Sequence, residues 1–234
     1  MRTLDNFSRF AVYYVPPKSD HLAKFAAAWF GWDIYQGMKV NYPKLHDLNY
    51  HIKEITSIPG KYGLHGTLKA PFFLAHDKTI EELRLSMSLL ARSIKKFEIP
   101  SICLRIIDEF IAIVPTSQNE SIHSLAKKCL EDLDSFREAE SDEILNKRRS
   151  GRLSTSEEHN LLKWGYPYVL DDFQFHLTMT GKLPLKVCRH VFSVLNSELQ
   201  EVLNAPLFIG KICLVGENKM DGKFGVIEEF SLVD

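Results

Sequence analysis

Hydrophobic residues recur along the whole chain at spacings that distinguish strands from helices. Alternating or continuous runs of apolar, aromatic and β-branched residues predict strands, and apolar residues three or four positions apart predict helices. The predicted strands cover residues 9–15, 64–70, 99–107, 110–114, 173–180, 207–215 and 224–230, and the predicted helices cover 20–29, 80–94, 117–136, 154–164 and 187–202. Residues 31–60 lack a clear period and predict a lid or side wall, whereas the charged residues 137–159 predict a solvated helix and turn.

The predicted order strand, helix, strand, strand occurs twice. His65 opens the first copy, and an Ile-Cys-Leu sequence begins 37 residues later, at residue 102. His176 opens the second copy, and the same three residues begin 36 positions later, at residue 212. Two copies are too few for a solenoid. The repeat instead predicts two related lobes that face each other about a pseudo-twofold axis.

Composition and charge narrow the class of protein. Hydrophobic residues make up 45% of the 234 residues and charged residues 25%, which are ordinary globular proportions. The 29 Lys and Arg nearly balance the 30 Asp and Glu, so the net charge is -1. This balance excludes the global basic field of a dedicated nucleic-acid binder, although a local basic cleft stays compatible with it.

Cysteine usage and hydropathy predict a cytoplasmic protein that does not enter a membrane. The four cysteines form no C-x-x-C pair, and three of them lie in apolar periodic segments. We therefore expect reduced core residues and no zinc site. Residues 1–15 lack the features of a signal peptide, and no apolar run approaches the ~20 residues that span a bilayer.

The sequence His-x-Thr occurs twice, at His65-Gly66-Thr67 and at His176-Leu177-Thr178. The chain has nine histidines and eight threonines, so chance alone predicts about 0.3 copies. A single copy is more often a half-buried strand edge than a functional site. Two copies at equivalent places in a repeat favour a functional site.

The motif spacing places its polar residues together, because residues i and i+2 of a strand point to the same face. The opposite faces carry residues such as Leu64, Leu68, Phe175 and Leu177, which suit packing under helices. The predicted polar faces of the two strands comprise His65, Thr67, Lys69, Gln174, His176, Thr178 and Thr180. If the lobes oppose these faces, two imidazoles and two hydroxyls converge on one cleft.

Two histidines and two threonines suit phosphodiester chemistry without a metal. One neutral imidazole can take a proton from the attacking water or hydroxyl, and the other, protonated, can give one to the leaving oxygen. The threonine hydroxyls can donate hydrogen bonds to the phosphate oxygens. The sequence does not distinguish the base from the acid.

Four further residues are candidates for substrate contacts. Lys69 could hold a phosphate as a point charge or simply extend from the strand end into solvent. Tyr13 could line the cleft or pack in the core. Tyr168 could stack on a base or sugar or close the junction of the lobes. Gln174 lies on the predicted polar face of the second motif strand.

The segments RFAVYYVPP, FAAAWFGWD, YGLHGTLKAPF and KWGYPYVLDDFQFHLTMTG resemble the two-histidine (2H) phosphoesterase superfamily. Within it they resemble a bacterial branch found beside phosphonate-degradation genes. The resemblance implies a LigT-like α+β fold, with two pseudo-symmetric lobes, each an antiparallel sheet backed by helices, around a central cleft. It implies one bilobal unit over residues 1–234, with interleaved lobes and motifs near 62–71 and 173–181. Met179, where the branch more often has leucine, lies on the core side.

The resemblance also implies a function and its residues. His65 and His176 would be catalytic, and Thr67 and Thr178 would bind phosphate, in metal-independent hydrolysis or transesterification of a cyclic phosphate on a ribose. The expected partner is a small cyclic phosphate, sugar phosphate or nucleotide, or an RNA end, with no cofactor. One alternative is a module that binds a nucleotide or RNA end without turnover. Another, a metal-dependent hydrolase, requires a carboxylate that neither polar face offers.

Overall fold

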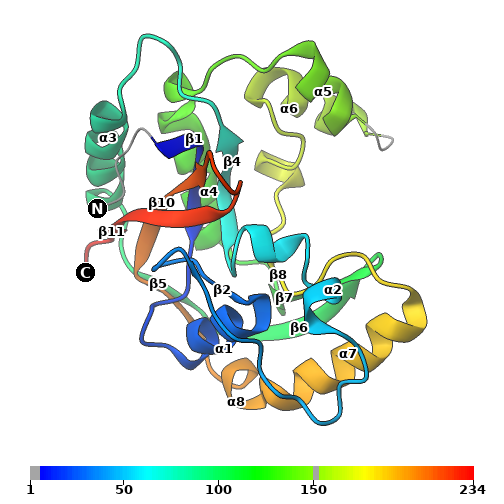
Figure 1. Ribbon diagram of the computed structural model, residues 1–234. Coiled ribbons are helices and arrows are strands. Elements are labelled where there is room, and N and C mark those ends of the chain that lie inside the picture. Colours follow the sequence, from blue (N-terminus) through cyan, green and yellow to red (C-terminus); the bar gives the residue numbers. More distant parts are fainter. Residues whose placement is uncertain (1–5, 150–152) are drawn as a thin grey trace.

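The computed structural model describes residues 6–149 and 153–234, and in it helices pack on antiparallel sheets (Figure 1). The strands are β1 (Phe7–Tyr14), β2 (Trp32–Asp33), β3 (Met38–Lys39), β4 (Gly66–Phe72), β5 (Phe97–Ile99), β6 (Ile102–Ile107), β7 (Phe110–Pro115), β8 (Leu177–Thr178), β9 (Leu207–Ile209), β10 (Lys211–Asn218) and β11 (Phe224–Ser231). The α-helices are α1 (His21–Phe30), α2 (Ile52–Ile55), α3 (Ile80–Arg92), α4 (Glu120–Asp132), α5 (Asp142–Arg148), α6 (Thr155–Trp164), α7 (Leu185–Glu198) and α8 (Gln200–Leu203). The predicted α+β class with antiparallel sheets is confirmed.

The largest sheet has seven strands in the order β11-β10-β1-β4-β8-β7-β6, and every neighbouring pair is antiparallel. The two motif strands, β4 and β8, are neighbours in its middle and meet at the pair Gly66–Leu177. We expected their polar faces to oppose each other across a cleft. The structure differs, because direct pairing of β4 with β8 places the two motifs side by side in one sheet.

The two sequence repeats exchange their hairpins. The first repeat runs β4-α3-β5-β6-β7, and its β6-β7 hairpin lies beside β8 of the second repeat. The second repeat ends in the β10-β11 hairpin, which lies on the β4 side of the sheet, next to β1. The short strands β5 and β9 pair with each other outside the main sheet. Neither repeat therefore forms its half of the sheet by itself.

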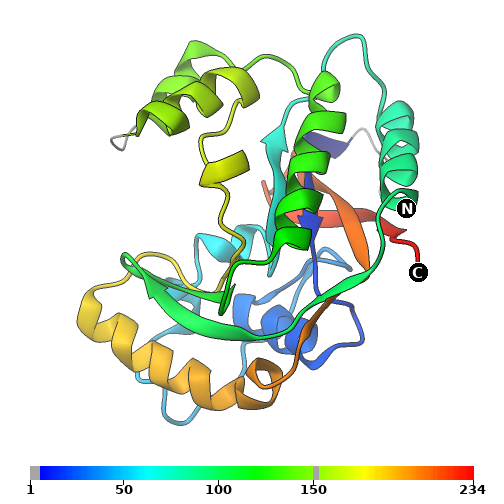
Figure 2. The ribbon, with the colours of Figure 1, turned by 180° about the vertical axis from the view of Figure 1, so that it is seen from behind.

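Helices cover the back of the sheet and leave its other face for the motif side chains. Figure 2 shows α3 and α4 lying across the β4 and β10 half from behind, where they contact β4, β10 and β11. Their inward side chains, including Leu83, Met87, Leu125 and Cys129, are fully buried. Helix α7 packs against β6 and β7. No helix within residues 6–149 and 153–234 has the length and apolarity to cross a membrane.

The sequences Ser117-x-x-Glu120 and Ser154-x-x-Glu157 both have the spacing of a capping box, which predicts a helix start at each. The capping box predicted at Ser117 and Glu120 is wrong: helix α4 begins at Glu120, and the side chain of Asn119 accepts from the Ile122 amide at 3.0 Å. Asn is as good an N-cap as Ser, and here it lies closer to the first turn. The box at Ser154 and Glu157 is confirmed, with reciprocal bonds of 3.1 and 2.6 Å.

Residues 31–60, which lacked a period, form short elements that pack beside the main sheet. They contain the β2-β3 hairpin, α2 and the start of a 3₁₀ turn, Pro59–Lys61. The Ile34 carbonyl accepts a hydrogen bond of 2.9 Å from the Val226 amide of β11. The segment thus joins the edge of the sheet.

Candidate active site

The four motif side chains occupy one face of the β4-β8 pair. Gly66 pairs with Leu177, and both face the back of the sheet. The residues directly before and after each of them therefore point to the other face. Extending this register by one residue in each direction pairs the motifs crosswise: His65 lies opposite Thr178, and Thr67 lies opposite His176. The two histidines are diagonal neighbours, a relation that sets residues about 7–8 Å apart, with their Cβ atoms somewhat closer. A group the size of a phosphate can lie between the two rings.

The two imidazoles are oriented in the same way. The Nδ1 atom of His65 lies 2.9 Å from the Gly63 carbonyl oxygen, and that of His176 lies 2.8 Å from the Gln174 carbonyl oxygen. A carbonyl only accepts, so Nδ1–H donates in both cases. The lone pair of each neutral ring therefore lies on Nε2, on the side away from its own backbone. Both motifs use the carbonyl two residues earlier in the chain.

The surroundings of His65 keep it neutral. Its ring stacks on Tyr13, with ring centres 4.0 Å apart and planes inclined by 25°, and Tyr62 lies 5.7 Å away. Burial lowers the pKa of His65 to about 4; the hydrogen bond to Gly63 opposes this decrease, and nearby His176 adds to it. At neutral pH this imidazole is an unprotonated acceptor. Tyr13, predicted as a substrate contact, is 1% exposed and acts as a platform under the His65 ring.

Gly66 leaves room for the ring of Phe175. A Cβ atom at this position would lie 2.3 Å from Cε2 and 2.7 Å from Cζ of Phe175, which precedes His176. We expect Gly66→Ala to lower the free energy of unfolding by about 1–3 kcal/mol, as overpacking of a filled core does. Urea denaturation measures this loss. The control is Gly181→Ala, because a Cβ there would approach other atoms no closer than 3.7 Å; equal stability of the two variants would contradict the expectation.

The alternation of β4 does not continue past Thr67. Thr67 pairs with Tyr13 of β1, and Lys69 pairs with Val12, the neighbouring residue of β1. Two steps along β4 therefore correspond to one step along β1, so Leu68 is an extra residue in β4. Such a bulge turns the following side chain to the other face. The prediction that Lys69 shares the face of Thr67 is therefore wrong.

Lys69 lies behind the sheet, where it contacts α4 and the turn that follows. It is 3% exposed, and its Nζ donates to Asp134 Oδ1 at 2.9 Å and to the Leu130 carbonyl at 3.3 Å. Burial lowers the pKa of Lys69, and the hydrogen bond with Asp134 opposes this shift. The side chain neutralises a carboxylate there and is not placed to hold a phosphate beside the histidines.

The other predicted contacts lie at the margin of this face. The Gln174 side chain is exposed, and only its carbonyl serves the site, by holding His176. Tyr168 is 48% exposed and meets Tyr166 edge-to-face at 5.6 Å. Thr180, predicted to lie on the polar face, is buried, and its hydroxyl accepts from the Ile111 amide at 3.0 Å.

Several residues near the histidines were not predicted from the sequence. Phe110 of β7 lies 6.1 Å from the His176 ring. On the β1 side, Arg9 and Lys61 both bind the carboxylate of Glu217. Only a weak signal in the sequence indicates these residues. Lys61 and Tyr62 precede the first motif closely, and Trp164 and its aromatic neighbours likewise precede the second motif.

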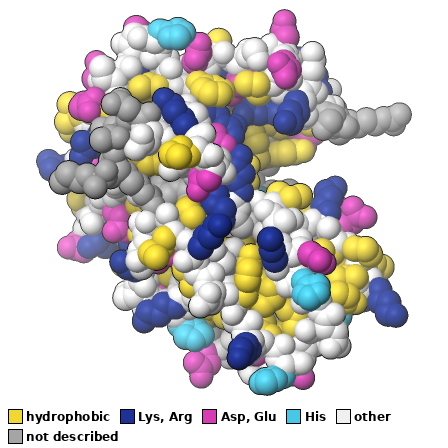
Figure 3. Space-filling view, in the orientation of Figure 1, with side chains coloured by type: hydrophobic (Ala, Val, Ile, Leu, Met, Phe, Trp, Pro, Cys, Tyr) yellow, Lys and Arg dark blue, Asp and Glu magenta, His cyan; other side chains and the backbone are white. Residues whose placement is uncertain are grey.

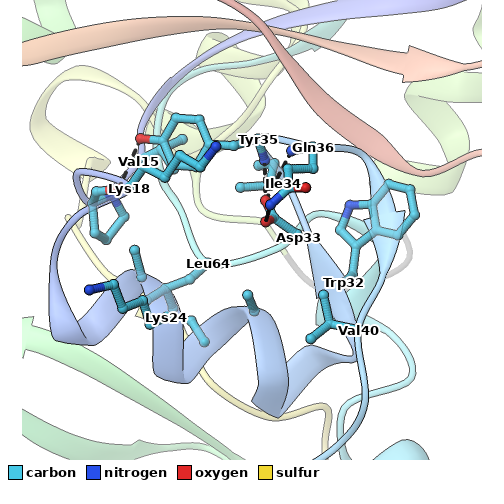
Figure 4. Close-up of a pocket in the computed structure, with 14 residues that line it drawn as sticks. Val15, Lys18, Lys24, Trp32, Asp33, Ile34, Tyr35, Gln36, Val40 and Leu64 are labelled. Atoms are coloured by element: carbon cyan, nitrogen blue, oxygen red, sulfur yellow. Dashed lines mark hydrogen bonds between the residues drawn. The ribbon is translucent and has the colours of Figure 1, made fainter.

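The surface is hollowed between the part formed by α5 and α6 and the part formed by β6, β7 and α7 (Figure 3). Strands β4 and β8 lie between these parts in both ribbon views. A separate cavity of about 380 Å³ lies between α1 and the β2-β3 hairpin, where Lys24, Trp32, Tyr35 and Leu64 line it (Figure 4). None of the four motif residues lines that cavity. Across the described parts of the chain, no three His, Cys, Asp or Glu side chains group as metal ligands.

Fold and site together define an α+β protein with paired His-x-Thr motifs at the centre of an antiparallel sheet. Residues 67–225 match the model of a family described as "Protein of unknown function (DUF1045)", and the chain belongs to this family. The chain is 26% identical over 220 residues to the "Ribose 1,5-bisphosphate phosphokinase PhnN" of Janthinobacterium sp. (strain Marseille), covering 91% of this chain and 48% of that protein. It is 29% identical over 175 residues to the protein of the same name from Laribacter hongkongensis (strain HLHK9), covering 75% of this chain and 40% of that protein.

The chain thus spans about half the length, or less, of these curated relatives. Among solved structures it is similar to E. coli LigT complexed with 3'-AMP, at a TM-score of 0.43 and 11% identity. That alignment covers 97% of this chain and 99% of LigT.

Proposed function

We propose that this chain is a metal-independent phosphoesterase that hydrolyses a cyclic phosphodiester on a ribose or a small sugar. The observation that supports it most is the crosswise register of the two motifs. It sets two imidazoles and two hydroxyls on one face, and each imidazole has its Nδ1–H bound to a backbone carbonyl. A binding module needs donors for an anion, but it does not need two imidazoles held in the same tautomer.

In the proposed reaction His65 is the general base and His176 the general acid. Nε2 of neutral His65 takes a proton from a water molecule whose oxygen forms a bond to phosphorus. The bond from phosphorus to one ring oxygen of the cyclic ester breaks, and protonated His176 gives that oxygen its proton. Thr67 and Thr178 donate to the non-bridging phosphate oxygens, where negative charge increases in the transition state. The product is a phosphomonoester with a free hydroxyl group.

The assignment of base and acid follows from the environments of the two rings. His65 lies against Tyr13 and Tyr62, and its hydrogen bond is partly buried. The corresponding bond of His176 is exposed. Both rings are partly exposed, so the ring that is more enclosed by aromatic groups suits the neutral base, and the ring whose hydrogen bond is exposed suits the acid.

The names of the curated relatives favour one substrate. Both are called ribose 1,5-bisphosphate phosphokinases, and this chain matches about half of each, or less. A ribose 1,2-cyclic phosphate that carries a 5-phosphate would yield ribose 1,5-bisphosphate when water opens the bond to O2. The proposed activity would then produce what the named kinase activity uses, within phosphonate metabolism.

The test is hydrolysis of ribose 5-phosphate 1,2-cyclic phosphate and of 2′,3′-cyclic AMP by the purified chain, followed by ³¹P NMR in the presence of EDTA. We expect a phosphomonoester from at least the first compound. Binding of these compounds without product would instead identify a nucleotide- or RNA-end-binding module. Activity that EDTA abolishes and a divalent metal restores would contradict the metal-independent mechanism.

The pKa of His65 predicts a pH profile. Because the base must be unprotonated and burial lowers its pKa to about 4, kcat/KM should fall on the acid side only as the pH approaches 4. An ordinary histidine would place this limb near pH 6.5. Initial rates between pH 3.5 and 8, with circular dichroism to confirm that the chain stays folded, provide the measurement. A limb near 6.5 would reject His65 as a buried base.

A further inference from the structure

Two basic side chains lie on the motif face of the sheet and share one carboxylate. Glu217 of β10 accepts from Nε and Nη2 of Arg9 at 2.6 and 3.0 Å and from Nζ of Lys61 at 2.7 Å. Its second oxygen also accepts from the Ser8 hydroxyl at 3.2 Å. The three charged groups, Arg9, Lys61 and Glu217, carry two positive charges and one negative charge.

Glu217 holds the two cations in place. The residue is 8% exposed, and although burial raises its pKa, hydrogen bonds from Arg9 and Lys61 lower it to about 2. The carboxylate therefore stays ionised at any working pH. The side chains of Arg9 and Lys61 remain 26% and 37% exposed. Fixed cations that solvent reaches can bind an anion through charge-assisted hydrogen bonds.

Aromatic contacts connect the cluster with His65. Lys61 Nζ is 5.7 Å from the centre of the Tyr62 ring, and that ring is 5.7 Å from the centre of the His65 imidazole. Tyr62 also stacks on Phe224, with centres 4.9 Å apart. On β1, Arg9 lies on the same face as Tyr13, the residue stacked on His65. The Tyr62 ring is thus a neighbour of both the Lys61 ammonium and the proposed base.

We propose that Arg9 and Lys61, held by Glu217, form a second anion subsite for a phosphate group remote from the bond that breaks. This inference rests on the proposed function and specifies the substrate class: a cyclic phosphodiester on a ribose that carries a second, terminal phosphate. In such a molecule the sugar ring separates the two phosphates, and the Tyr62 ring is a neighbour of both Lys61 and His65. The cluster keeps a net charge of +1, which favours an anionic group such as a phosphomonoester.

The experiment compares ribose 1,2-cyclic phosphate with and without a 5-phosphate as substrates of the full chain. We expect the wild type to prefer the 5-phosphorylated compound in kcat/KM by tenfold or more, roughly the effect of one charge-assisted hydrogen bond. Lys61→Gln should reduce this preference ratio by about tenfold, and Lys61→Arg should keep most of it. The control with the same change of charge is Lys127→Gln, because Lys127 pairs with Glu131 on α4, behind the sheet.

A purely structural ion pair would give a different result. Lys61→Gln would then change the two kcat/KM values in the same proportion, and an unaltered ratio overturns the proposal. Binding of ribose 1,5-bisphosphate, measured by calorimetry, separates this proposal from the proposed reaction. Binding that Lys61→Gln weakens about tenfold supports the subsite even if neither compound is hydrolysed, whereas binding that is indifferent to Lys61 overturns it.

Discussion

His65→Ala and His176→Ala should each lower kcat for the cyclic phosphodiester by about 10²- to 10⁴-fold, the usual contribution of a positioned acid or base. Each substitution removes one of the two imidazoles that we propose transfer protons and that the crosswise register brings together. Neither ring joins two strands by a hydrogen bond, since each is hydrogen-bonded to the carbonyl two residues before it. Steady-state kinetics with the 5-phosphorylated cyclic ribose phosphate provides the measurement.

A histidine outside the site is the control for this experiment. His21 is exposed at the start of α1, so His21→Ala should leave kcat within about twofold of the wild type. Circular dichroism of all three variants shows whether the fold is retained. Full activity of either motif variant would exclude that histidine from catalysis.

Asp134→Ala should lower the free energy of unfolding by about 3 kcal/mol, because it leaves the buried ammonium of Lys69 without its carboxylate. Lys69 is 3% exposed, and its other acceptor is the Leu130 carbonyl at 3.3 Å. Urea denaturation at neutral pH measures the loss. The loss should diminish as the pH rises toward 10, because burial lowers the pKa of Lys69, so the folded chain gives up its proton before the unfolded chain does.

Lys69→Met is the matching variant, and it should cost less than Asp134→Ala. Asp134 keeps Arg137 as a partner, at 2.9 and 3.0 Å, and its side chain is 22% exposed. The methionine fills the space of the buried lysine stem with an apolar group. A large loss of activity in Lys69→Met with unchanged stability would restore the phosphate-binding role that the sequence pattern favoured.

The contrast between Thr67 and Lys69 shows what a local pattern can predict. The period of two places His65 and Thr67 on one face, and the structure agrees, because no bulge lies between them. Lys69 is only two residues further along, but the bulge at Leu68 reverses its side. That bulge depends on how β4 pairs with β1, more than 50 positions earlier in the chain, and no property of residues 64–70 encodes it.

Long-range pairing also explains the other differences between the predicted and the observed site. The alternation of polar and apolar residues within each motif strand could be predicted from the sequence. Whether the two strands oppose each other or pair edge to edge depends on contacts between residues more than 100 positions apart. The anion subsite joins Arg9 to Glu217, which are 208 positions apart. A single sequence contains no signal for such a pair.

The hairpin exchange has a consequence for how the chain matures. Strand β1 lies between β4 and β10, so one of its edges stays uncovered until the much later residues of β10 have been synthesised. Contacts of such long sequence separation form slowly, and an uncovered strand edge is a template for aggregation. Nascent chains that stall before residue 211 would expose this edge, so we expect chaperone dependence to last until β10 has been synthesised.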